Sequence, residues 1–306
     1  MNHIKKAILT GGNGYIGYVL LQRLLTEGVE VHAITHRSRE RLDKFLPGRQ
    51  IHFAEGRDSF FSELVQQVQP EAIFHLASIH VEPNNFDEMM AMVETNVRVG
   101  TALLHGAAQC ETKPVFVNTG SYWQFTEDET YSPKTFYAAT KQAFQDLMLY
   151  FCRCRDVRAM TLVLYDSFGL DDVRPKLWTK LLHAPAGSRF PLTEGKQYIE
   201  LVHVEDIARA FLHAAHMLME GQGLNGSYAV RTEERVTLRE MLERWHRKAG
   251  LDLELAWGAI PYWSGQVFHP WRGEMLPGWH PKLDVHTVIA EWLRNQRKIV
   301  HEEATN

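Results

Sequence analysis

At 306 residues, with 45% hydrophobic and 23% charged side chains, the chain is long enough to bury a large core and fits neither a disordered nor a fibrous class. The formal net charge of −4 and the scattered Lys and Arg residues provide no basic surface for nucleic acid. No apolar run approaches the roughly 18 residues of a membrane span, and no signal peptide precedes the first strand-like segment. We therefore expect a cytoplasmic protein without nucleic-acid or membrane partners.

The cysteines and histidines give no sign of a disulfide framework or a metal site. Cys110, Cys152 and Cys154 are few and odd in number, which suits a reducing compartment. The 16 histidines show no HExxH or similar spacing. We assign no metal.

A glycine-rich turn follows the first predicted strand. Residues 4–10 predict a buried strand, and the amphipathic run 18–26 predicts a helix that stops near Gly28. Between them a glycine recurs at every third position, at Gly11, Gly14 and Gly17. Such glycines let the backbone approach a pyrophosphate, and the following helix offers free amides to it. A tight connection alone is the alternative, but the position favours dinucleotide binding.

The second predicted strand, 29–35, bears on cofactor choice. Its end is where a dinucleotide fold usually carries an acid for the adenosine ribose, and this chain has Thr35 there, followed by His36-Arg37-Ser38-Arg39. Because Arg37 with His36, Ser38 or Arg39 could bind a 2′-phosphate that an acid would repel, NADP is favoured over NAD. The alternative is a set of exposed charges opening a helix.

Strands and helices continue to alternate, which predicts a parallel, doubly wound α/β sheet. Residues 51–54 and 71–78 predict the third and fourth strands, and Asp58 between them suits either an adenine contact or a helix N-cap. A long helical stretch, 86–110, contains Asn96. The fifth strand, 115–121, carries Thr119 and Ser121 at its carboxyl end, where ligands collect, although either hydroxyl could simply serve the loop backbone.

Tyr137 and Lys141 lie four residues apart in a segment that favours helix, so they share one face. A phenol beside a fixed ammonium has its ionised form favoured, and it can exchange a proton with a reacting oxygen near neutral pH. A surface lysine near a half-buried tyrosine is the alternative, and the spacing alone does not decide between the two.

Five features together resemble the extended short-chain dehydrogenase/reductases: Thr10 to Gly17, Leu76-Ala77-Ser78, Asn96, the strand end at Thr119 and Ser121, and Tyr137-x-x-x-Lys141. The resemblance implies a Rossmann-type fold and an NAD(P)-dependent oxidoreductase. It places the catalytic groups at Tyr137, Lys141 and either Thr119 or Ser121, with Thr119 preferred because it closes the strand. It assigns cofactor binding to Gly11, Gly14, Tyr15, Ile16, Gly17, His36, Arg37, Asp58, Leu76, Ala77, Ser78, Asn96, Tyr137 and Lys141.

Later segments resemble the nucleotide-sugar branch of that family, and most of all its CDP-abequose and CDP-paratose synthase group. These segments are 118–124, 137–144 and 164–169, with Asp166 where Asn is usual, and Arg272-Gly273-Glu274, which resembles the part that gives an arginine to the diphosphate. The group reduces the C4 ketone of a CDP-linked deoxy sugar with NADPH, in deoxysugar biosynthesis. The resemblance thus implies Asp166 and Arg272 as substrate-binding residues, and a homodimer formed through the helices of 86–110 and 135–154.

Three departures from the family pattern are visible. Tyr122-Trp123-Gln124-Phe125 replaces the usual ending in Val-Tyr-Gly, Ile199-Glu200 stands where an arginine is typical, and Arg57 stands where an Asp is typical.

The resemblance also implies a domain division and a mechanism. We expect a dinucleotide-binding domain over 1–165 and a mainly substrate-binding lobe over 166–306, from which about 200–220 returns to the first domain. Tyr137 would protonate the sugar carbonyl oxygen while Lys141 holds the nicotinamide ribose and favours the tyrosinate.

Two alternatives remain open at this point. One is a nucleotide-sugar epimerase on the same fold; a dehydratase is disfavoured because Gly120-Ser121 replaces its usual Asp-Glu pair. The other is a non-catalytic NADP-binding sensor or scaffold.

Overall fold

The computed structural model describes residues 3–36, 40–54, 59–125, 131–169, 172, 174–182 and 184–292. The chain divides into two compact units, each made of three segments. The first unit comprises 1–164, 207–230 and 271–279, and the second comprises 165–206, 231–270 and 280–306. That the second one binds substrate stays a prediction.

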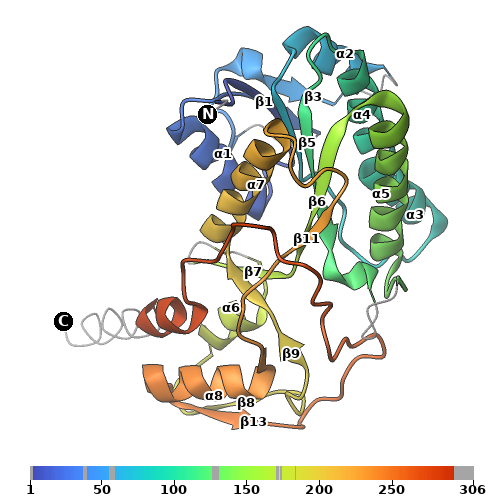
Figure 1. The fold of residues 1–306 in the computed structure, drawn as a ribbon. Coiled ribbons are helices and arrows are strands. Elements are labelled where there is room, and N and C mark those ends of the chain that lie inside the picture. Colours follow the sequence, from blue (N-terminus) through green and yellow to red (C-terminus); the bar gives the residue numbers. More distant parts are fainter. Residues whose placement is uncertain are drawn as a thin grey trace. The chain divides into compact units, whose positions relative to one another are not determined.

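A seven-stranded sheet forms the centre of the first unit, with the strand order β11-β6-β5-β4-β1-β2-β3 (Figure 1). All of its neighbouring strands pair in parallel. The strands are β1 (Lys6–Thr10), β2 (Glu30–Thr35), β3 (Ile51–Phe53), β4 (Ala72–His75), β5 (Val115–Ser121), β6 (Arg158–Leu164) and β11 (Ser227–Val230).

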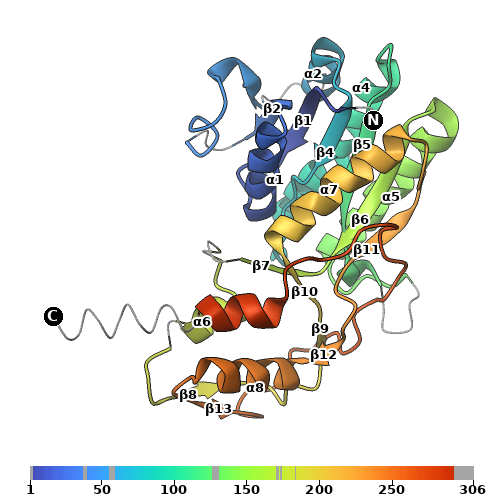
Figure 2. The same ribbon diagram turned by 60° about the vertical axis from the view of Figure 1, so that its left-hand side comes forward.

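Helices cover both faces of this sheet, as Figures 1 and 2 show. On one face lie α1 (Tyr15–Thr26) and α7 (Val204–Met219), and on the other lie α2 (Phe60–Val68), α4 (Val99–Gln109) and α5 (Phe136–Arg155). Between α2 and α4 the chain also forms α3 (Phe86–Val93) and a π-helix (Glu94–Arg98). Short 3-10 turns occupy Gly48–Gln50 and Tyr122–Gln124.

The sheet is buried on both faces because its strands are apolar almost throughout. Ile8, Ile73 and Phe116 from three strands share one core cluster with apolar side chains of α2, α4 and α5. On the opposite face Phe211 of α7 meets Phe74 of β4 edge to face, with ring centroids 6.5 Å apart. Parallel strands that are covered on both sides are expected to read as continuous hydrophobic runs.

Among its described residues, the second unit contains three small two-stranded sheets. These pair β7 (Asp166–Phe168) with β10 (Leu201–His203), β9 (Tyr198–Ile199) with β12 (Val236–Thr237), and β8 (Ser188–Pro191) with β13 (Leu253–Ala256). Its helices are α6 (Leu177–Leu182), α8 (Leu238–Ala249) and a helical segment at 285–292. Trp245 of α8 is fully buried in the core of this unit.

The predicted α/β fold with a doubly wound parallel sheet is confirmed; most element boundaries shift by one to three residues, and two elements differ more. The predicted single helical stretch 86–110 is two α-helices joined by the π-helix around Asn96. The fourth strand ends at His75 rather than Ser78, because the amides of Leu76 and Ala77 turn to the Thr10 hydroxyl instead of continuing the ladder. Within the part of the chain that the structure describes, no helix has the length and apolar character needed to cross a membrane.

Candidate active site

The glycine turn after β1 is tightly packed, and two glycines make it possible. Gly11 has a φ of 75°, and a Cβ there would lie 2.8 Å from the backbone nitrogen of Ala77. A Cβ at Gly17 would lie 2.1 Å from the carbonyl oxygen of Gly11. Any side chain at either position would push the turn away from β4 or away from α1.

The N-terminus of α1 is suited to an anion. Its N-cap is Gly14, which has no side chain to occupy the first amides, and its first turn has no acidic residue. The first amides of a helix and the positive end of its dipole favour a phosphate group. The residues present therefore fit the pyrophosphate of a dinucleotide.

A cavity of about 410 Å³ opens beside this turn, in the size range of about 300–1,000 Å³ that is typical of small-molecule sites. Its walls come from the glycine turn, the end of β2, the exit of β4 and the π-helix region. Several residues assigned to the cofactor from the sequence line it: Gly11, Gly14, His36, Leu76, Ala77 and Ser78. Asn96 lies in the π-helix whose residues Glu94, Thr95 and Arg98 also line it.

The part of the site that would select NADP is only partly described. His36 lines the cavity and is exposed, while Arg37 and Asp58 lie outside the described residues. Arg41, which sequence reasoning missed, donates to the carbonyl oxygen of Asn13 at 3.2 Å and lies over the Tyr18 ring at 4.2 Å. The positively charged Arg41 side chain therefore contacts the glycine turn. Tyr15 and Ile16 form the first residues of α1.

Thr10 and His75 join the end of β1 to the exit of β4. The Thr10 hydroxyl accepts from the amides of Leu76 and Ala77 at 3.1 and 3.0 Å, so its own proton goes to His75 Nδ1 at 2.9 Å. Burial, together with the nearby charge of Lys141, lowers the pKa of His75 to about 3. His75 is therefore a neutral structural group that holds Thr10, which lines the cavity.

Asn96 bridges the exit of β4 to α5. Its Oδ1 accepts from the amide of Ile79 at 2.8 Å and from the hydroxyl of Ser78 at 3.2 Å. Its Nδ2 donates to the Ile79 carbonyl at 3.1 Å and to Thr140 Oγ1 at 3.0 Å. The π-helix turns this buried amide inward, and such local widenings of an α-helix often occur at functional sites.

Tyr137 and Lys141 lie in the first turns of α5, which begins after the N-cap Thr135. Both side chains are buried, and Lys141 Nζ lies 5.8 Å from the centre of the Tyr137 ring. Burial raises the pKa of Tyr137 to about 12, while hydrogen bonds with the side chains of Ser78 and Ser121 act in the opposite direction. Burial also lowers the pKa of Lys141 to about 8. The tyrosinate expected from the neighbouring ammonium is not favoured here, because burial outweighs that attraction.

The two candidate hydroxyls at the end of β5 point to different partners. Thr119 Oγ1 donates to the carbonyl oxygen of His75 at 2.9 Å, inside the sheet. Ser121 is hydrogen-bonded to Tyr137. The structure thus brings Ser121, Tyr137 and Ser78 together, and Ser78 in turn lines the cavity.

His80 also lies at this site and was missed in the sequence. Its ring meets the Tyr137 ring edge to face, with centroids 4.6 Å apart, and lies 5.1 Å from the ring of Trp123. The available signal was its position shortly after β4, since ligands bind beyond the carboxyl ends of parallel strands.

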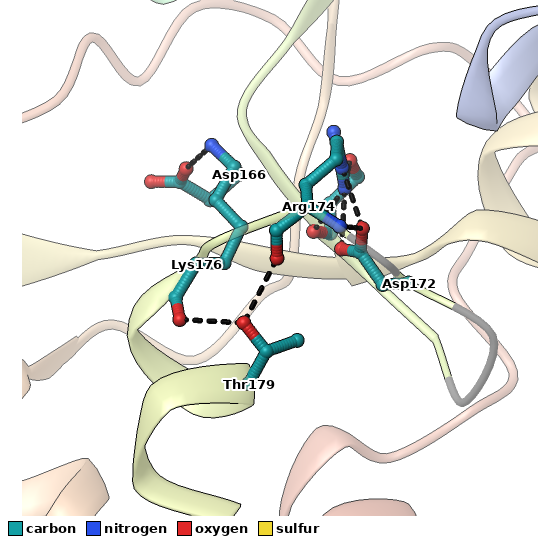
Figure 3. A network of polar contacts seen from close by, with 6 residues as sticks. Asp166, Asp172, Arg174, Lys176 and Thr179 are labelled. Atoms are coloured by element: carbon teal, nitrogen blue, oxygen red, sulfur yellow. Dashed lines mark hydrogen bonds and ion pairs between the residues drawn. The ribbon is translucent and has the colours of Figure 1, made fainter. Parts of the chain in front are cut away.

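The two residues assigned to substrate belong to different units. Asp166 begins β7 in the second unit and pairs with Lys176 at 3.6 Å, beside a second network in which Arg174 binds Asp172 (Figure 3). Arg272 belongs to the first unit and is half-buried. Its neighbour Trp271 stacks on Phe125 at 4.3 Å, directly after the turn that follows Ser121. The residue before Arg272 therefore packs against the residue that follows the turn Tyr122–Gln124. Across the described ranges, no group of three or more His, Cys, Asp or Glu side chains could hold a metal ion.

Comparison with known proteins agrees with this geometry. The model of the NAD dependent epimerase/dehydratase family matches residues 7–227. CDP-abequose synthase of Yersinia pseudotuberculosis is 25% identical over 78% of this chain and 82% of its own length. CDP-abequose synthase of Salmonella typhimurium is 24% identical over 94% of this chain and 97% of its own. UDP-glucose 4-epimerase of Mycolicibacterium smegmatis is 26% identical over 75% of this chain and 79% of its own.

Solved structures share the fold. UDP-glucose 4-epimerase of Thermotoga maritima, crystallised with UDP-glucose, superposes with a TM-score of 0.73 at 20% identity over 96% of this chain and 99% of its own. The NAD complex of UDP-glucose 4-epimerase from Thermus thermophilus gives a TM-score of 0.73 at 21% identity over 95% of this chain and 99% of its own.

A parallel sheet with a glycine turn, a cavity beside it and a buried Tyr-x-x-x-Lys pair defines an NAD(P)-dependent enzyme of the extended short-chain dehydrogenase/reductase class. Within that class, the chain belongs to the NAD dependent epimerase/dehydratase family.

Proposed function

We propose that the protein is an NADPH-dependent reductase of a nucleotide-linked 4-keto-deoxy sugar, with CDP as the nucleotide, and that it acts in deoxysugar biosynthesis. The observation that carries this proposal is the contact of the Tyr137 hydroxyl with Ser78 and Ser121. Because Ser78 lines the dinucleotide cavity, the proton donor stands at the end of the cofactor site. The similarity to two CDP-abequose synthases supports the choice of nucleotide and reaction.

The bound dinucleotide would supply a hydride to the carbonyl carbon of the sugar. Tyr137 donates its proton to the carbonyl oxygen as that oxygen gains negative charge, and a pKa of about 12 means that the proton is present at neutral pH. The Ser121 hydroxyl donates a hydrogen bond to the same oxygen and polarises it. Lys141 supplies a positive charge below its pKa of about 8, which stabilises the tyrosinate left after the transfer.

Several residues would hold the two ligands. The glycine turn and the first residues of α1, including Tyr15 and Ile16, bind the pyrophosphate. His36 and Arg37 bind the 2′-phosphate that distinguishes NADP from NAD, and Asp58 binds the adenine. Arg272 pairs with the diphosphate of the sugar nucleotide, and Asp166 contacts the substrate. We keep Thr119 outside the reaction because its hydroxyl is committed to His75.

An epimerase on the same fold is the second candidate, because UDP-glucose 4-epimerases are among the relatives and structural neighbours. An epimerase oxidises and then reduces its substrate on a cofactor that it retains, typically NAD. The sequence His36-Arg37-Ser38-Arg39 instead suits an exchangeable NADPH, which favours the reductase. The presence of both Tyr137 and Lys141 disfavours a non-catalytic sensor.

The proposal includes a homodimer formed through α3 and α5. These helices pack beside each other, and each carries exposed apolar side chains: Phe86 and Met90 on α3, and Leu147 and Tyr150 on α5. Exposed apolar side chains on neighbouring helices are typical of association surfaces. A cytoplasmic location stays a prediction.

Replacing Tyr137 with Phe tests the mechanism. With a CDP-linked 4-keto-deoxy sugar, we expect the Tyr137→Phe variant to lose about 10²–10⁴-fold in kcat, the range of general acid catalysis, while its Kd for NADPH stays within about twofold. Spectrophotometric measurement of NADPH oxidation gives kcat, and fluorescence titration gives Kd. Unchanged turnover would contradict the role of Tyr137.

The nucleotide and cofactor are tested separately. We expect CDP to raise the melting temperature of the wild-type protein more than UDP, GDP or dTDP, and NADPH more than NADH, because bound ligand stabilises the folded state. A shift with dTDP or GDP and none with CDP would exclude the CDP-linked substrate.

A further inference from the structure

Gln124 has no exposed surface, and its side-chain amide connects two parts of the active site. Its Oε1 accepts from the backbone amide of Ser121 at 2.9 Å. Its Nε2 donates to Oε1 of Gln142 at 2.9 Å and to Oε1 of Gln145 at 3.2 Å, both on α5. We propose that Gln124 is a positioning residue that fixes Ser121 against Tyr137 by tying the turn of Ser121 to the helix of Tyr137 and Lys141. This inference rests on the proposed function.

The hydrogen-bond partners of the Gln124 and Gln142 side chains determine how these two amides are oriented. Gln142 donates from Nε2 to the Asp146 carboxylate at 2.9 Å, which leaves its Oε1 for Gln124. Gln145 also lies against Ser227, whose hydroxyl oxygen is 2.6 Å from its Nε2 and can either donate or accept, so Gln145 takes the orientation that gives its Oε1 to Gln124. Gln124 must therefore present its NH₂ group to α5 and its oxygen to Ser121. Hydrogen bonds aligned in one direction strengthen one another, and the series of bonds from Ser121 through Gln124 and Gln142 ends on the Asp146 carboxylate.

Ser121 and Gln124 also cap each other across the 3-10 turn Tyr122–Gln124. Their reciprocal capping box joins the Ser121 side chain to the backbone of the turn and the Gln124 side chain to the backbone of Ser121. Ser121 Oγ further accepts from the amide of Trp123 at 3.3 Å. Because these bonds use the lone pairs of the hydroxyl, its proton is left for Tyr137 or for a substrate oxygen. Gln124 thus fixes both the place and the donor role of the Ser121 hydroxyl.

Backbone bonds make a second connection between the same two elements. Ser132 donates to the carbonyl oxygen of Gln124 at 3.3 Å, and Lys134 donates to that of Trp123 at 3.2 Å, just before the N-cap of α5. These bonds hold the turn near α5 but leave Ser121 itself unconstrained. The Gln124 amide is the group that reaches Ser121.

The main test compares Gln124→Met with the wild-type protein and with Gln50→Met, which replaces another buried glutamine of the same unit. For NADPH oxidation with the CDP-linked keto sugar, we expect Gln124→Met to lower kcat about 30- to 100-fold, the effect of a small misplacement of a reacting group. The Kd for NADPH should stay within about twofold. We expect Gln50→Met to keep wild-type kcat.

Gln124→Glu provides a conservative variant. Burial keeps its carboxyl group protonated, so one oxygen still accepts from the Ser121 amide and the other donates to Oε1 of Gln142 or Gln145. We expect Gln124→Glu to retain within about fivefold of wild-type kcat, whereas Gln124→Met does not. Equal losses in the two variants would overturn the proposal, as would a loss of the same size in Gln50→Met or an undiminished kcat in Gln124→Met.

A readout independent of turnover separates this inference from the proposed function. Hydrogen exchange followed by mass spectrometry should show faster exchange in the peptide that contains the Ser121 amide in Gln124→Met, by about tenfold or more, with the peptides of β1 and β2 unchanged. An unchanged rate overturns the inference even where turnover falls. If the wild-type protein shows no turnover of the keto sugar, the proposed function fails, and the exchange experiment still decides whether Gln124 holds Ser121.

If Gln124→Met does not fold, the outer partners replace it in both measurements. We expect Gln142→Met and Gln145→Met each to lower kcat less than about threefold, because each leaves one acceptor for Gln124. The double variant should lose at least about tenfold, since residues in one hydrogen-bond network couple. An additive double variant would overturn the proposal.

Discussion

Tyr137 and Lys141 respond to the same burial in opposite ways. Removing water penalises the tyrosinate and the ammonium alike, so the pKa of Tyr137 rises to about 12 and that of Lys141 falls to about 8. At neutral pH the tyrosine holds the proton that a ketone reduction needs, and the lysine still holds its charge. Keeping the Lys141 ammonium beside Tyr137 therefore costs the folded protein the free energy of burying a cation.

That cost predicts a pH-dependent gain in stability for Lys141→Met. The folded pKa of about 8 lies below the unfolded value of 10.5, so between these two pH values the unfolded state binds more protons and wild-type stability rises with pH. Below pH 8 the full cost, about 3 kcal/mol, is present, and Met at this position does not have it. We expect the free energy of unfolding of Lys141→Met to exceed that of the wild type by about 3 kcal/mol at pH 7.

The stability gain of Lys141→Met should disappear above pH 10.5, the pKa of this lysine in the unfolded state. Urea denaturation of both proteins at pH 7 and at about pH 10.5 measures the difference, and other titrating groups cancel in the comparison. A gain of equal size at both pH values would show that burial of the charge is not its cause.

Substitutions at Ser121 and at Thr119 should have different effects on kcat and on the free energy of unfolding. Because Ser121 touches Tyr137, we expect Ser121→Ala to lower kcat about 100-fold, as the loss of one donor to a developing oxyanion does. Thr119→Val should keep kcat within about threefold but lose about 1 kcal/mol of unfolding free energy, since its bond to the His75 carbonyl is lost. Steady-state kinetics and urea denaturation of the two variants measure both effects. The reverse order in kcat would assign the catalytic hydroxyl to Thr119.

At the scale of elements, the sequence predicted what local patterns encode. The β1 strand, the glycine turn and α1 were predictable because apolar periodicity and glycine spacing are local signals. The π-helix around Asn96 was not, because it depends on bonds from Asn96 to Ile79 and Thr140, which are distant in sequence. The contact between Ser121 and Tyr137 was not predictable for the same reason: Thr119 and Ser121 both close the strand, and only the packing of α5 distinguishes them.

The π-helix predicts a strong effect of Asn96→Ala. This change removes four hydrogen bonds that join Ser78 and Ile79 to Thr140, and it leaves the buried Thr140 hydroxyl and the half-buried Ile79 backbone without these partners. We expect a loss of about 2–4 kcal/mol in unfolding free energy and a Kd for NADPH raised about tenfold, because Ser78 lines the cofactor cavity.

Asn85→Ala is a matched control for this experiment. Asn85 is exposed and caps α3 by accepting from the amide of Glu88 at 2.9 Å. Its loss should cost about 1 kcal/mol and leave the Kd for NADPH unchanged. Denaturation and fluorescence titration measure both. Equal effects of the two variants on Kd would mean that Asn96 does not position the cofactor site.

At the scale of the whole molecule, the alternation of strands and helices was enough to predict a parallel sheet but not its full extent. The edge strand β11 pairs with β6, although residues 165–206 of the second unit and then α7 lie between the two strands in the chain. Residues 271–279 then return to it, with Ala229 bridging Met275. No local pattern marks such returns, because they are determined by contacts between segments far apart in the chain.

The apolar faces of α3 and α5 predict a homodimer. Phe86 is 69% exposed and Leu147 is 40% exposed, and burying each would contribute about 1.5–3 kcal/mol on the scale for full side-chain burial. We expect the wild-type protein to sediment as a dimer and the double variant Phe86→Glu with Leu147→Glu to sediment as a monomer, because charges placed in the contact would have to lose their hydration. Leu224→Glu, at a side chain that is 47% exposed outside these helices, should remain a dimer. Analytical ultracentrifugation distinguishes the two states. A wild-type monomer, or a double variant that still dimerises, would exclude this surface as the interface.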